Sequence, residues 1–468
     1  MIADLKPYAE YKESGLPWLG RVPGHWDVRP AFGAFAPNHE RNLGMKEKTV
    51  LSLSYGRIII KPVEKLRGLV PESFETYQIV NPGDIVIRTT DLQNDHTSLR
   101  IGMVRDRGII TSAYLALRVM DGVISDFGFQ FLNVWDMSKA IYGYGSGLRQ
   151  NLDFSHFKRM PVALPPPDEQ AAIVRFLDWA NGRLERTIRA KRKVIALLNE
   201  QKQAIIHRAV TRGLDPTVPL KPSGIPWLGD IPQHWEVRRL KFVANRIVDC
   251  LHATPHYSDS GVHPAIRTAD ISPGVIHVSR AKKISSTDYA RWTTRLEPAE
   301  GDILYSREGE RFGIAACVPA GVRLCISQRM MAFRIATKYC PDFVMQLLNS
   351  RSTYGQALQD VTGATAPHVN ISTIRNFFLG MPTRQEQDAI MEHVSSEVRP
   401  IEVTISRLES EIELLREYRT RLVADVVTGK LDVREAAACL PDQMTEPDAE
   451  IDDVEADDTE DDLSEEAA

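Results

Sequence analysis

Basic side chains at predicted strand ends and loops are the residues of this sequence with the clearest chemical use. Arginine and lysine donate hydrogen bonds to base edges and bind phosphates, so such a set is suited to double-stranded DNA. Taken singly, each is more often a solvated surface charge. The candidate DNA-binding residues are Arg57, Lys61, Arg88, Arg100 and Arg105 in the first half of the chain and Arg267, Arg307, Arg311 and Arg329 in the second.

Catalytic motifs are missing from the sequence. It contains no GxxxxGKS/T phosphate loop and no GxGxxG dinucleotide motif, and NPGD at 81–84 is better explained as a turn than as a methyltransferase tetrapeptide. A nuclease-like set of Asp168 with Glu200 and Lys202 is disfavoured, because its members lie about 32 residues apart on predicted helices. We therefore expect no catalytic residues, no metal site and no cofactor.

The charge of the chain is unevenly distributed. The net charge over 468 residues is −5, yet residues 442–468 hold fourteen acidic and no basic residues. Residues 1–441 then carry 57 basic against 48 acidic side chains, about +9, which suits a polyanionic partner. Because like charges repel and the segment has little to bury, we expect an acidic tail over 436–468 to be disordered.

The remaining composition is that of a soluble cytoplasmic protein. Hydrophobic residues make up 43% of the chain, and no apolar run approaches the ~18 residues that a membrane span needs. The five cysteines include no CxxC pair, which argues against a disulfide framework or a structural zinc and favours a reducing compartment. The polar N-terminus is unlike a signal peptide.

The elements that must position the basic residues are arranged as an internal repeat. An opening motif, GLPWLGRVPGHWDVRP at 15–30, recurs as GIPWLGDIPQHWEVRR at 224–239. VNPGDIVI (80–87) matches AEGDILYS (299–306), and a segment from residue 153 matches one from residue 370. The offset drifts through the middle of each half and then stays at 217. The chain is therefore a duplicated unit with a variable front and a rear of fixed length.

The front and rear of each half differ in their hydrophobic pattern. The fronts alternate apolar and polar residues around Gly-containing turns, which predicts mixed α/β structure dominated by strands. The rears are helical. Pro400 in the second copy and Asn181-Gly182 in the first predict a short helix followed by a long one. His25 and His234 belong to the opening motifs, which favours a structural role for both.

The long helices carry apolar residues in alternating steps of three and four, with the same spacing in both copies. This spacing predicts a seam between two helices, which most simply pack on each other about a pseudo-twofold axis. The alternative is that each helix only covers its own globular domain. The predicted seam residues are Leu184, Ile188, Ile195, Leu198 and Ile205 in the first helix and Ile401, Ile405, Leu408, Ile412, Leu415 and Leu422 in the second.

These motifs together resemble the specificity (S) subunits of type I restriction-modification enzymes. The resemblance covers roughly residues 8–435. It rests on the duplicated PWLG…P..W.V motif, the Gly-Asp turns, LPPPDEQ and MPTRQEQ before the helices, and the closing TRGLD and TGKLD. The second copy departs from the family pattern, with Thr383-Arg384 where two prolines are usual.

The resemblance implies an α+β fold in which two mixed α/β target recognition domains are separated by the antiparallel coiled coil. It also implies a non-catalytic subunit that reads a bipartite, asymmetric DNA sequence. The implied partners are two methyltransferase (M) subunits, which methylate adenine, and restriction (R) subunits bound through them. The expected divisions are a first recognition domain (1–167), a first helical region (168–215), a second recognition domain (216–384), a second helical region (385–435) and the acidic tail (436–468).

Two alternatives remain open at this point. The chain could serve a methylation-only system or a restriction system of another type, which neighbouring genes would decide. It could also be a two-domain coiled-coil scaffold that binds protein without reading a DNA sequence.

Overall fold

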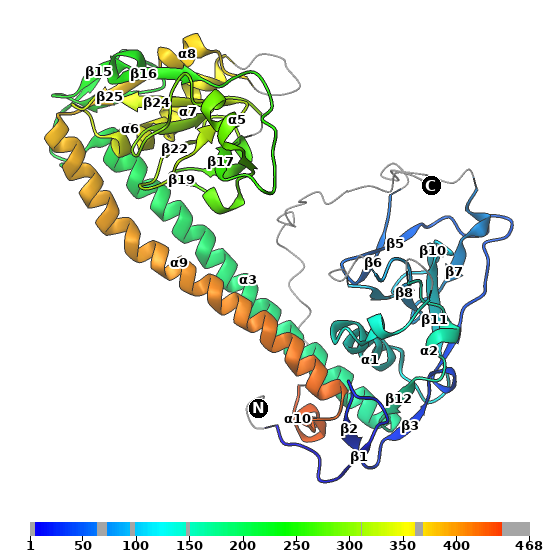
Figure 1. Ribbon diagram of the computed structural model, residues 1–468. Coiled ribbons are helices and arrows are strands. Elements are labelled where there is room, and N and C mark those ends of the chain that lie inside the picture. The colour runs from blue at the N-terminus through cyan, green and yellow to red at the C-terminus, as the bar shows by residue number, and fades with distance from the viewer. Residues whose placement is uncertain are drawn as a thin grey trace. The chain divides into compact units, whose positions relative to one another are not determined.

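The computed structural model describes residues 5–62, 73–93, 99–146, 150–309, 311–360 and 368–441 (Figure 1). The chain divides into two units, which are described separately. Unit 1 is Met1–Lys191 with Glu411–Ala468, and unit 2 is Arg192–Ser410. Each unit therefore contains the start of one long helix and the end of the other.

Unit 1 is built around an antiparallel sheet with the strand order β4-β11-β8-β9. Helix α1 packs against this sheet, and the pairs β1-β2, β12-β3, β5-β6 and β10-β7 surround it. The strands are β1 (Tyr11–Glu13), β2 (Arg21–Pro23), β3 (Asp27–Pro30), β4 (Phe35–Pro37), β5 (Leu51–Ser54), β6 (Arg57–Ile60), β7 (Gln78–Val80), β8 (Ile85–Arg88), β9 (Ile101–Met103), β10 (Gly108–Ile110), β11 (Tyr114–Val119) and β12 (Pro161–Leu164). The helices are α1 (Ser125–Met137), α2 (Phe154–Phe157), α3 (Pro167–Arg212), which continues into unit 2, and α10 (Arg434–Ala438).

Unit 2 repeats this plan with the strand order β16-β24-β21-β22. Its strands are β13 (Leu220–Pro222), β14 (Asp230–Pro232), β15 (Glu236–Arg239), β16 (Ala244–Asp249), β17 (His263–Ile266), β18 (Ile271–Ser272), β19 (Val275–Ile276), β20 (Lys283–Ile284), β21 (Ile303–Ser306), β22 (Ala315–Cys317), β23 (Cys325–Ile326), β24 (Met330–Ile335) and β25 (Phe378–Met381). The helices are α4 (Leu240–Val243), α5 (Ser286–Trp292), α6 (Pro341–Leu348), α7 (Arg351–Leu358), α8 (Ile371–Arg375) and α9 (Arg384–Val427), which continues into unit 1.

The two units match element for element where the sequence repeats. The pairs β1-β2 and β12-β3 of unit 1 correspond to β13-β14 and β15-β25 of unit 2, and α1 corresponds to α6. The Gly-Asp turns also match, since the Asp84 carboxylate accepts the Asn81 N–H and the Asp302 carboxylate accepts the Ala299 N–H, each at 2.9 Å. The predicted α+β fold with an internal repeat is therefore confirmed.

The units diverge in the segments added to this plan. Unit 1 adds the β5-β6 hairpin and the β10-β7 pair. Unit 2 instead adds the β18-β19 hairpin and the order β20-β17-β23, in which β17 and β23 run parallel. These different added segments account for the change of sequence offset through the middle of each half.

A glutamate in the first turn of each long helix holds the opening motif in place, and we call this arrangement the carboxylate clamp. In unit 1, the buried Glu169 accepts hydrogen bonds from Trp26 Nε1 (2.9 Å) and Tyr8 Oη (2.7 Å), and His25 Nε2 lies 2.7 Å from its other oxygen. Burial and the neighbouring Glu169 carboxylate raise the pKa of Tyr8, so its hydroxyl stays a donor. A buried carboxylate needs such partners.

Unit 2 contains the same clamp around Glu386. Trp235 Nε1 donates to its Oε1 at 3.0 Å, and His234 Nε2 lies 2.8 Å from its Oε2. The tryptophan is fully buried, as Trp26 is in unit 1. Its ring meets Phe343 of α6 edge-on, just as Trp26 meets Phe127 of α1. His25 and His234 therefore have the structural role that their place in the motif predicts.

The glutamine that follows each glutamate secures the helix against the sheet. Gln170 accepts the Ile124 N–H at the start of α1 and donates to the Pro165 and Gly122 carbonyls. Gln387 accepts the Cys340 N–H at the start of α6 and donates to the Pro382 carbonyl. The Glu-Gln pair thus ties the opening motif and the first long helix turn to one helix of the recognition domain.

Helices α3 and α9 correct the prediction of a short helix followed by a long one. Each is continuous, over 46 and 44 residues, and Pro400 lies inside α9. A proline inside a helix removes one hydrogen bond and costs roughly 3 kcal/mol. Val394, Val398 and Ile401 around it are all buried, and this burial offsets the loss.

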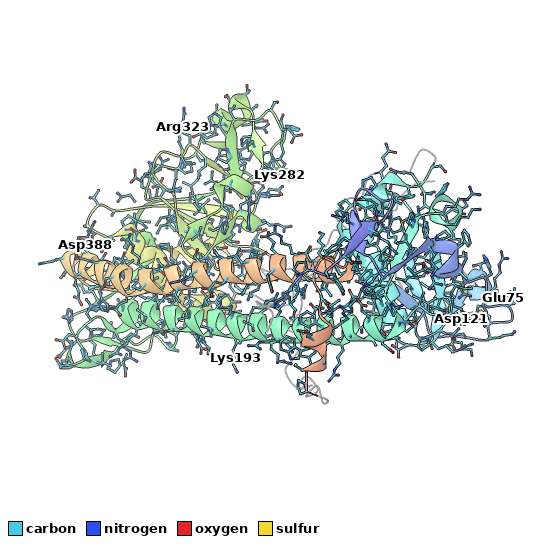
Figure 2. The ribbon with its side chains drawn as sticks, turned by 90° about the horizontal axis from the view of Figure 1, so that it is seen from below. Glu75, Asp121, Lys193, Lys282, Arg323 and Asp388 are labelled. Atoms are coloured by element: carbon cyan, nitrogen blue, oxygen red, sulfur yellow. The ribbon has the colours of Figure 1, made fainter. Side chains whose placement is uncertain are left out.

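The two helices pair in an antiparallel coiled coil (Figure 1). In unit 1, Glu185 pairs with Arg419 (3.3 Å) and Lys191 with Glu411 (2.5 Å). In unit 2, Lys202 pairs with Glu402 at 3.3 Å. The partner's number falls as the α3 number rises, which defines the antiparallel direction. All eleven predicted seam residues are buried or partly buried, whereas charged residues such as Lys193 lie on the exposed faces (Figure 2).

The C-terminal part of the described chain differs from the prediction of a tail beginning at residue 436. That position falls inside α10, where Ala437 and the nearby Leu440 are buried in unit 1. Arg175 donates to the Leu440 and Pro441 carbonyls at 2.8 and 3.2 Å. Burial therefore orders the chain up to Pro441, and the rest of the predicted acidic tail lies outside the described residues.

Replacing Glu169 with alanine tests the carboxylate clamp. Trp26 Nε1 and Tyr8 Oη would lose a buried acceptor, so we expect the free energy of unfolding to fall by about 1–3 kcal/mol. Urea denaturation followed by tryptophan fluorescence measures the change. The control is Asp168→Ala, because Asp168 is the exposed neighbour in the same helical turn. An equal effect of the two substitutions would show that the clamp adds no stability of its own.

Candidate functional site

Some of the candidate DNA-binding residues lie at one edge of the sheet in each unit, and the others lie on loops and on the β5-β6 hairpin. In unit 1, Arg88 ends β8 opposite Tyr114, the first residue of β11. In unit 2, Arg307 directly follows β21 and Arg329 directly precedes β24, while the neighbouring β16 ends at Asp249. The ends of these strands meet at the same edge, where loops carry side chains outward from a rigid sheet.

The β5-β6 hairpin of unit 1 exposes Arg57 beside an unusual turn. Tyr55 and Gly56 both have positive φ angles, 46° and 75°. Two such residues make a tight hairpin turn, but this backbone is strained for tyrosine. The Tyr55 side chain is 85% exposed at the tip. Arg57 is exposed next to it, and Lys61 at the end of the hairpin is partly exposed.

The other three candidates of unit 1 differ in their surroundings. Arg88 is partly exposed, and Arg105 is exposed with an ion pair to Asp126 at 2.7 Å. Arg100 is fully buried. Its guanidinium donates to the carbonyls of Arg88 (3.3 Å), Thr90 (2.8 Å) and Asp91 (3.1 Å), and so supports the loop that follows β8. In this structure Arg100 therefore positions a surface loop from within.

Two candidate DNA-binding residues of unit 2 make hydrogen bonds within that unit. Arg267 makes a two-point interaction with Asp270, from Nε and Nη2 to the two carboxylate oxygens, both at 2.9 Å. Arg311 is exposed and donates from Nη2 to the Ile271 carbonyl at 2.8 Å. Both arginines thus present a guanidinium whose direction is set by an internal acceptor.

Arg307 is the centre of a charged cluster at the sheet edge of unit 2. Its buried guanidinium lies 3.1 Å from the Asp249 carboxylate and 2.8 Å from that of Glu308. Removing a buried cation that lies between two carboxylates lowers the free energy of unfolding by about 3–5 kcal/mol. Arg307 therefore fixes these two carboxylates, and its role here is one of positioning.

The two carboxylates in turn hold three side chains that reach solvent. His252 Nε2 lies 3.1 Å from Asp249, His368 Nδ1 lies 3.1 Å from Glu308, and Arg329 Nε lies 3.9 Å from Glu308. The exposed fractions of these side chains are 68%, 44% and 57%, in that order. We call His252, Arg329 and His368 the donor group of unit 2.

Sequence reasoning missed most of this cluster. Arg307 and Arg329 were predicted, but His252 and His368 are more than a hundred residues apart and only the fold brings them together. Glu308 directly follows Arg307, and that pairing of opposite charges at a strand end is the one local signal of the cluster.

Asp249, Cys250 and His252 bring metal-ligand atoms within 4.8 Å of one another. Their surroundings favour the ion-pair cluster over a metal site. The Asp249 carboxylate already faces Arg307, and burial raises the pKa of the Cys250 thiol. A metal needs the deprotonated thiolate, so both features disfavour a cation at this position.

Known proteins that are similar to the chain as a whole are specificity subunits. No protein-family model matches the chain. The chain is 22% identical over 334 residues to the type I restriction enzyme MjaVIII specificity subunit of Methanocaldococcus jannaschii, covering 70% of this chain and 75% of that protein. It is also 22% identical over 234 residues to the putative type I restriction enzyme MjaX specificity subunit of the same organism, covering 47% and 53%.

The fold is shared with a solved chain from a structural study of complex assembly and conformational transition of the type I R-M system. The TM-score is 0.60 at 14% sequence identity, over 88% of this chain and 99% of the other. Across the residues that the structure describes, no helix has the length and apolar character needed to cross a membrane. The chain is therefore similar in sequence to type I restriction enzyme specificity subunits over most of its length, and it shares the fold of a solved chain from a type I R-M system.

Proposed function

We propose that this chain is the non-catalytic subunit that gives a type I restriction-modification complex its DNA sequence specificity. Each unit reads one half of a bipartite, asymmetric target. The observation that carries this proposal is a contrast within the repeat. The carboxylate clamps and the central sheets are the same in both units, whereas the strand-end surfaces differ. One scaffold with two different surfaces suits two different half-sites.

The surfaces carry the chemistry that reads base edges. Arg329 in the donor group of unit 2 carries a guanidinium that donates hydrogen bonds, and guanine presents two acceptors, O6 and N7, in the major groove. Unit 1 instead exposes an aromatic side chain, Tyr55, beside Arg57. The partly buried carboxylates of Asp249 and Glu308 hold the donor group of unit 2 in place before any DNA arrives, which supports readout by direct contact.

We further propose that the partners are two methyltransferase subunits, with restriction subunits bound through them, in the cytoplasm. The pseudo-twofold scaffold offers two equivalent halves, which suits two copies of one partner. The coiled coil is proposed to act as a ruler. Its predicted section from Leu184 to Thr211 is about 42 Å long, and reading heads on one face of DNA sit about 34–36 Å apart.

A band-shift assay with the methyltransferase partner tests the proposal as a whole. We expect binding of a duplex carrying the bipartite target at moderate salt, with affinity falling by at least about a thousandfold for random duplexes. Equal affinity for all duplexes, lost uniformly as salt rises, would instead identify a general polyanion binder or a scaffold. Neighbouring genes decide whether a restriction subunit completes the system.

Substituting Arg329 with alanine tests direct readout by unit 2. We expect the half-site of unit 2 to contain a G·C pair at which this variant loses about 1–3 kcal/mol of discrimination, with the other half-site unchanged. Arg280→Ala is the control, because Arg280 is an exposed arginine of unit 2 outside the donor group. Mapping methylated sites for both variants measures the effect. Unchanged specificity in the Arg329 variant would contradict direct readout by this residue.

Shortening the coiled coil tests the ruler. Removing Ala196–Asn199 from α3 alone puts the seam out of phase, so we expect an altered spacer between the half-sites or loss of assembly. Removing the facing segments 193–199 and 404–410 together keeps the phase and shortens the pair by about 10 Å, near three base pairs. Assembly with an unchanged spacer in both variants would rule out the ruler.

A further inference from the structure

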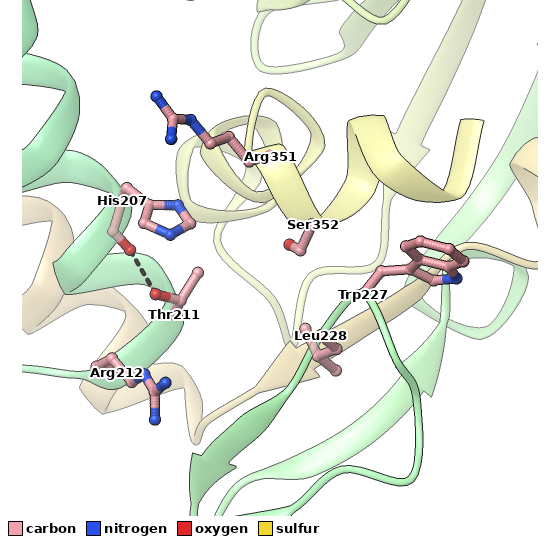
Figure 3. A pocket seen from close by; sticks show the side chains of 7 residues that line it. All are labelled: His207, Thr211, Arg212, Trp227, Leu228, Arg351 and Ser352. Carbon is pink, nitrogen blue, oxygen red and sulfur yellow. Dashed lines mark hydrogen bonds between the residues drawn. The ribbon is translucent and has the colours of Figure 1, made fainter. Parts of the chain in front are cut away.

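A cavity of about 230 Å³ lies in unit 2 where the end of α3 meets the opening motif and α7 (Figure 3). Three elements contribute to its lining. His207 and Arg212 come from α3, Trp227 and Leu228 from the opening motif, and Arg351 and Ser352 from the first turn of α7. Three basic side chains therefore surround one small cavity, with an indole that is 42% exposed beside them.

The basic side chains of the cavity have no internal counter-charge. Among the residues that the structure describes, the guanidinium groups of Arg212 and Arg351 and the ring of His207 have no hydrogen-bond or ion-pair partner. Burial and the two neighbouring guanidinium groups lower the pKa of His207. The two guanidinium charges at the cavity therefore have only solvent or a bound anion to balance them.

The comparison with unit 1 shows that these charges are not part of the repeated scaffold. Trp227 and Leu228 match Trp18 and Leu19 of the first opening motif. The basic residues have no such counterparts. The aligned positions of unit 1 hold Ala424, Gly429 and the buried Trp135 in place of His207, Arg212 and Arg351. The alignment at Arg351 follows the match of Phe127 with Phe343, which pack on the two buried tryptophans.

Two guanidinium groups and an imidazole that the fold does not use internally, gathered in one unit only, indicate a ligand. We propose that this cavity binds a phosphate group. Guanidinium groups fit phosphate oxygens with two parallel hydrogen bonds, and a phosphate offers more acceptors and more charge than a single carboxylate. The volume accommodates such a group and is below the ~300 Å³ from which pockets for whole small molecules begin.

The phosphate has two possible sources with the same chemistry. A backbone phosphate of bound DNA would add an anchor on the unit 2 side, and this source rests on the proposed function. A free nucleotide would bind independently of DNA, with its base able to stack on the exposed Trp227 indole. A phosphate from either source would bind one site per chain, because the basic residues of the cavity occur in unit 2 and have no counterparts at the aligned positions of unit 1.

Calorimetric titration of the full chain with inorganic pyrophosphate, at fixed ionic strength and without DNA, tests the site. We expect the Arg212→Gln/Arg351→Gln variant to bind roughly tenfold or more weakly than the unsubstituted chain, because each lost guanidinium removes charged hydrogen bonds. Both side chains are exposed, so the variant should fold. Arg280→Gln, an exposed arginine outside the cavity, should bind within about twofold of the unsubstituted chain.

Titration with target DNA distinguishes the sources. A backbone phosphate predicts that pyrophosphate competes with DNA and that the double variant has a salt slope smaller by about two. A free nucleotide predicts unchanged DNA binding and binding of adenosine diphosphate that the double variant loses. Equal pyrophosphate binding by the unsubstituted chain and the double variant would overturn the proposal, as would cavity-dependent binding of a poly-glutamate peptide without pyrophosphate binding. Pyrophosphate binding is measured without DNA, so a failure of the phosphate site can be told apart from a failure of the proposed DNA recognition.

Discussion

The structure depends on a carboxylate in the first turn of each long helix, which is buried at Glu169 and partly exposed at Glu386. Glu169 and Glu386 accept the indole N–H of a buried tryptophan and face the histidine before it. An ionised carboxylate is tolerated inside a protein only with such donors, and its place in the first helical turn adds a favourable interaction with the helix dipole. The clamp therefore fixes where each recognition domain begins relative to the helix that follows it.

The opening motifs that the clamps hold also contact the C-terminal ends of the long helices. Gly213, after α3, lies next to Trp235, and Gly429, after α9, lies next to Pro23 and Trp26. Both glycines have positive φ angles, 72° and 74°, which end a helix without strain. The end of the first helix thus packs on the second opening motif, and the end of the second helix packs on the first. Each unit therefore contains the C-terminal end of the long helix that begins in the other unit.

The sequence predicted the parts of the structure that repeat, because the two copies in the chain can be compared with each other. The duplication, the strand-rich fronts with helical rears, the coiled-coil seam and the structural role of His25 and His234 followed from it. Features set by tertiary burial could not be predicted. Pro400 stays helical because its neighbours are buried, and Arg100 and Arg307 look like surface arginines in the sequence although both are enclosed. The donor group unites distant segments, so local spacing gives no sign of it.

We propose that two units on one clamped scaffold read two different half-sites. Genome-wide mapping of methylated adenines in cells that express this chain with its methyltransferase partner tests this proposal. We expect one asymmetric motif of two different half-sites separated by a spacer of constant length. Methylation at a single uninterrupted motif, at a symmetric motif with identical halves, or without sequence preference would contradict it.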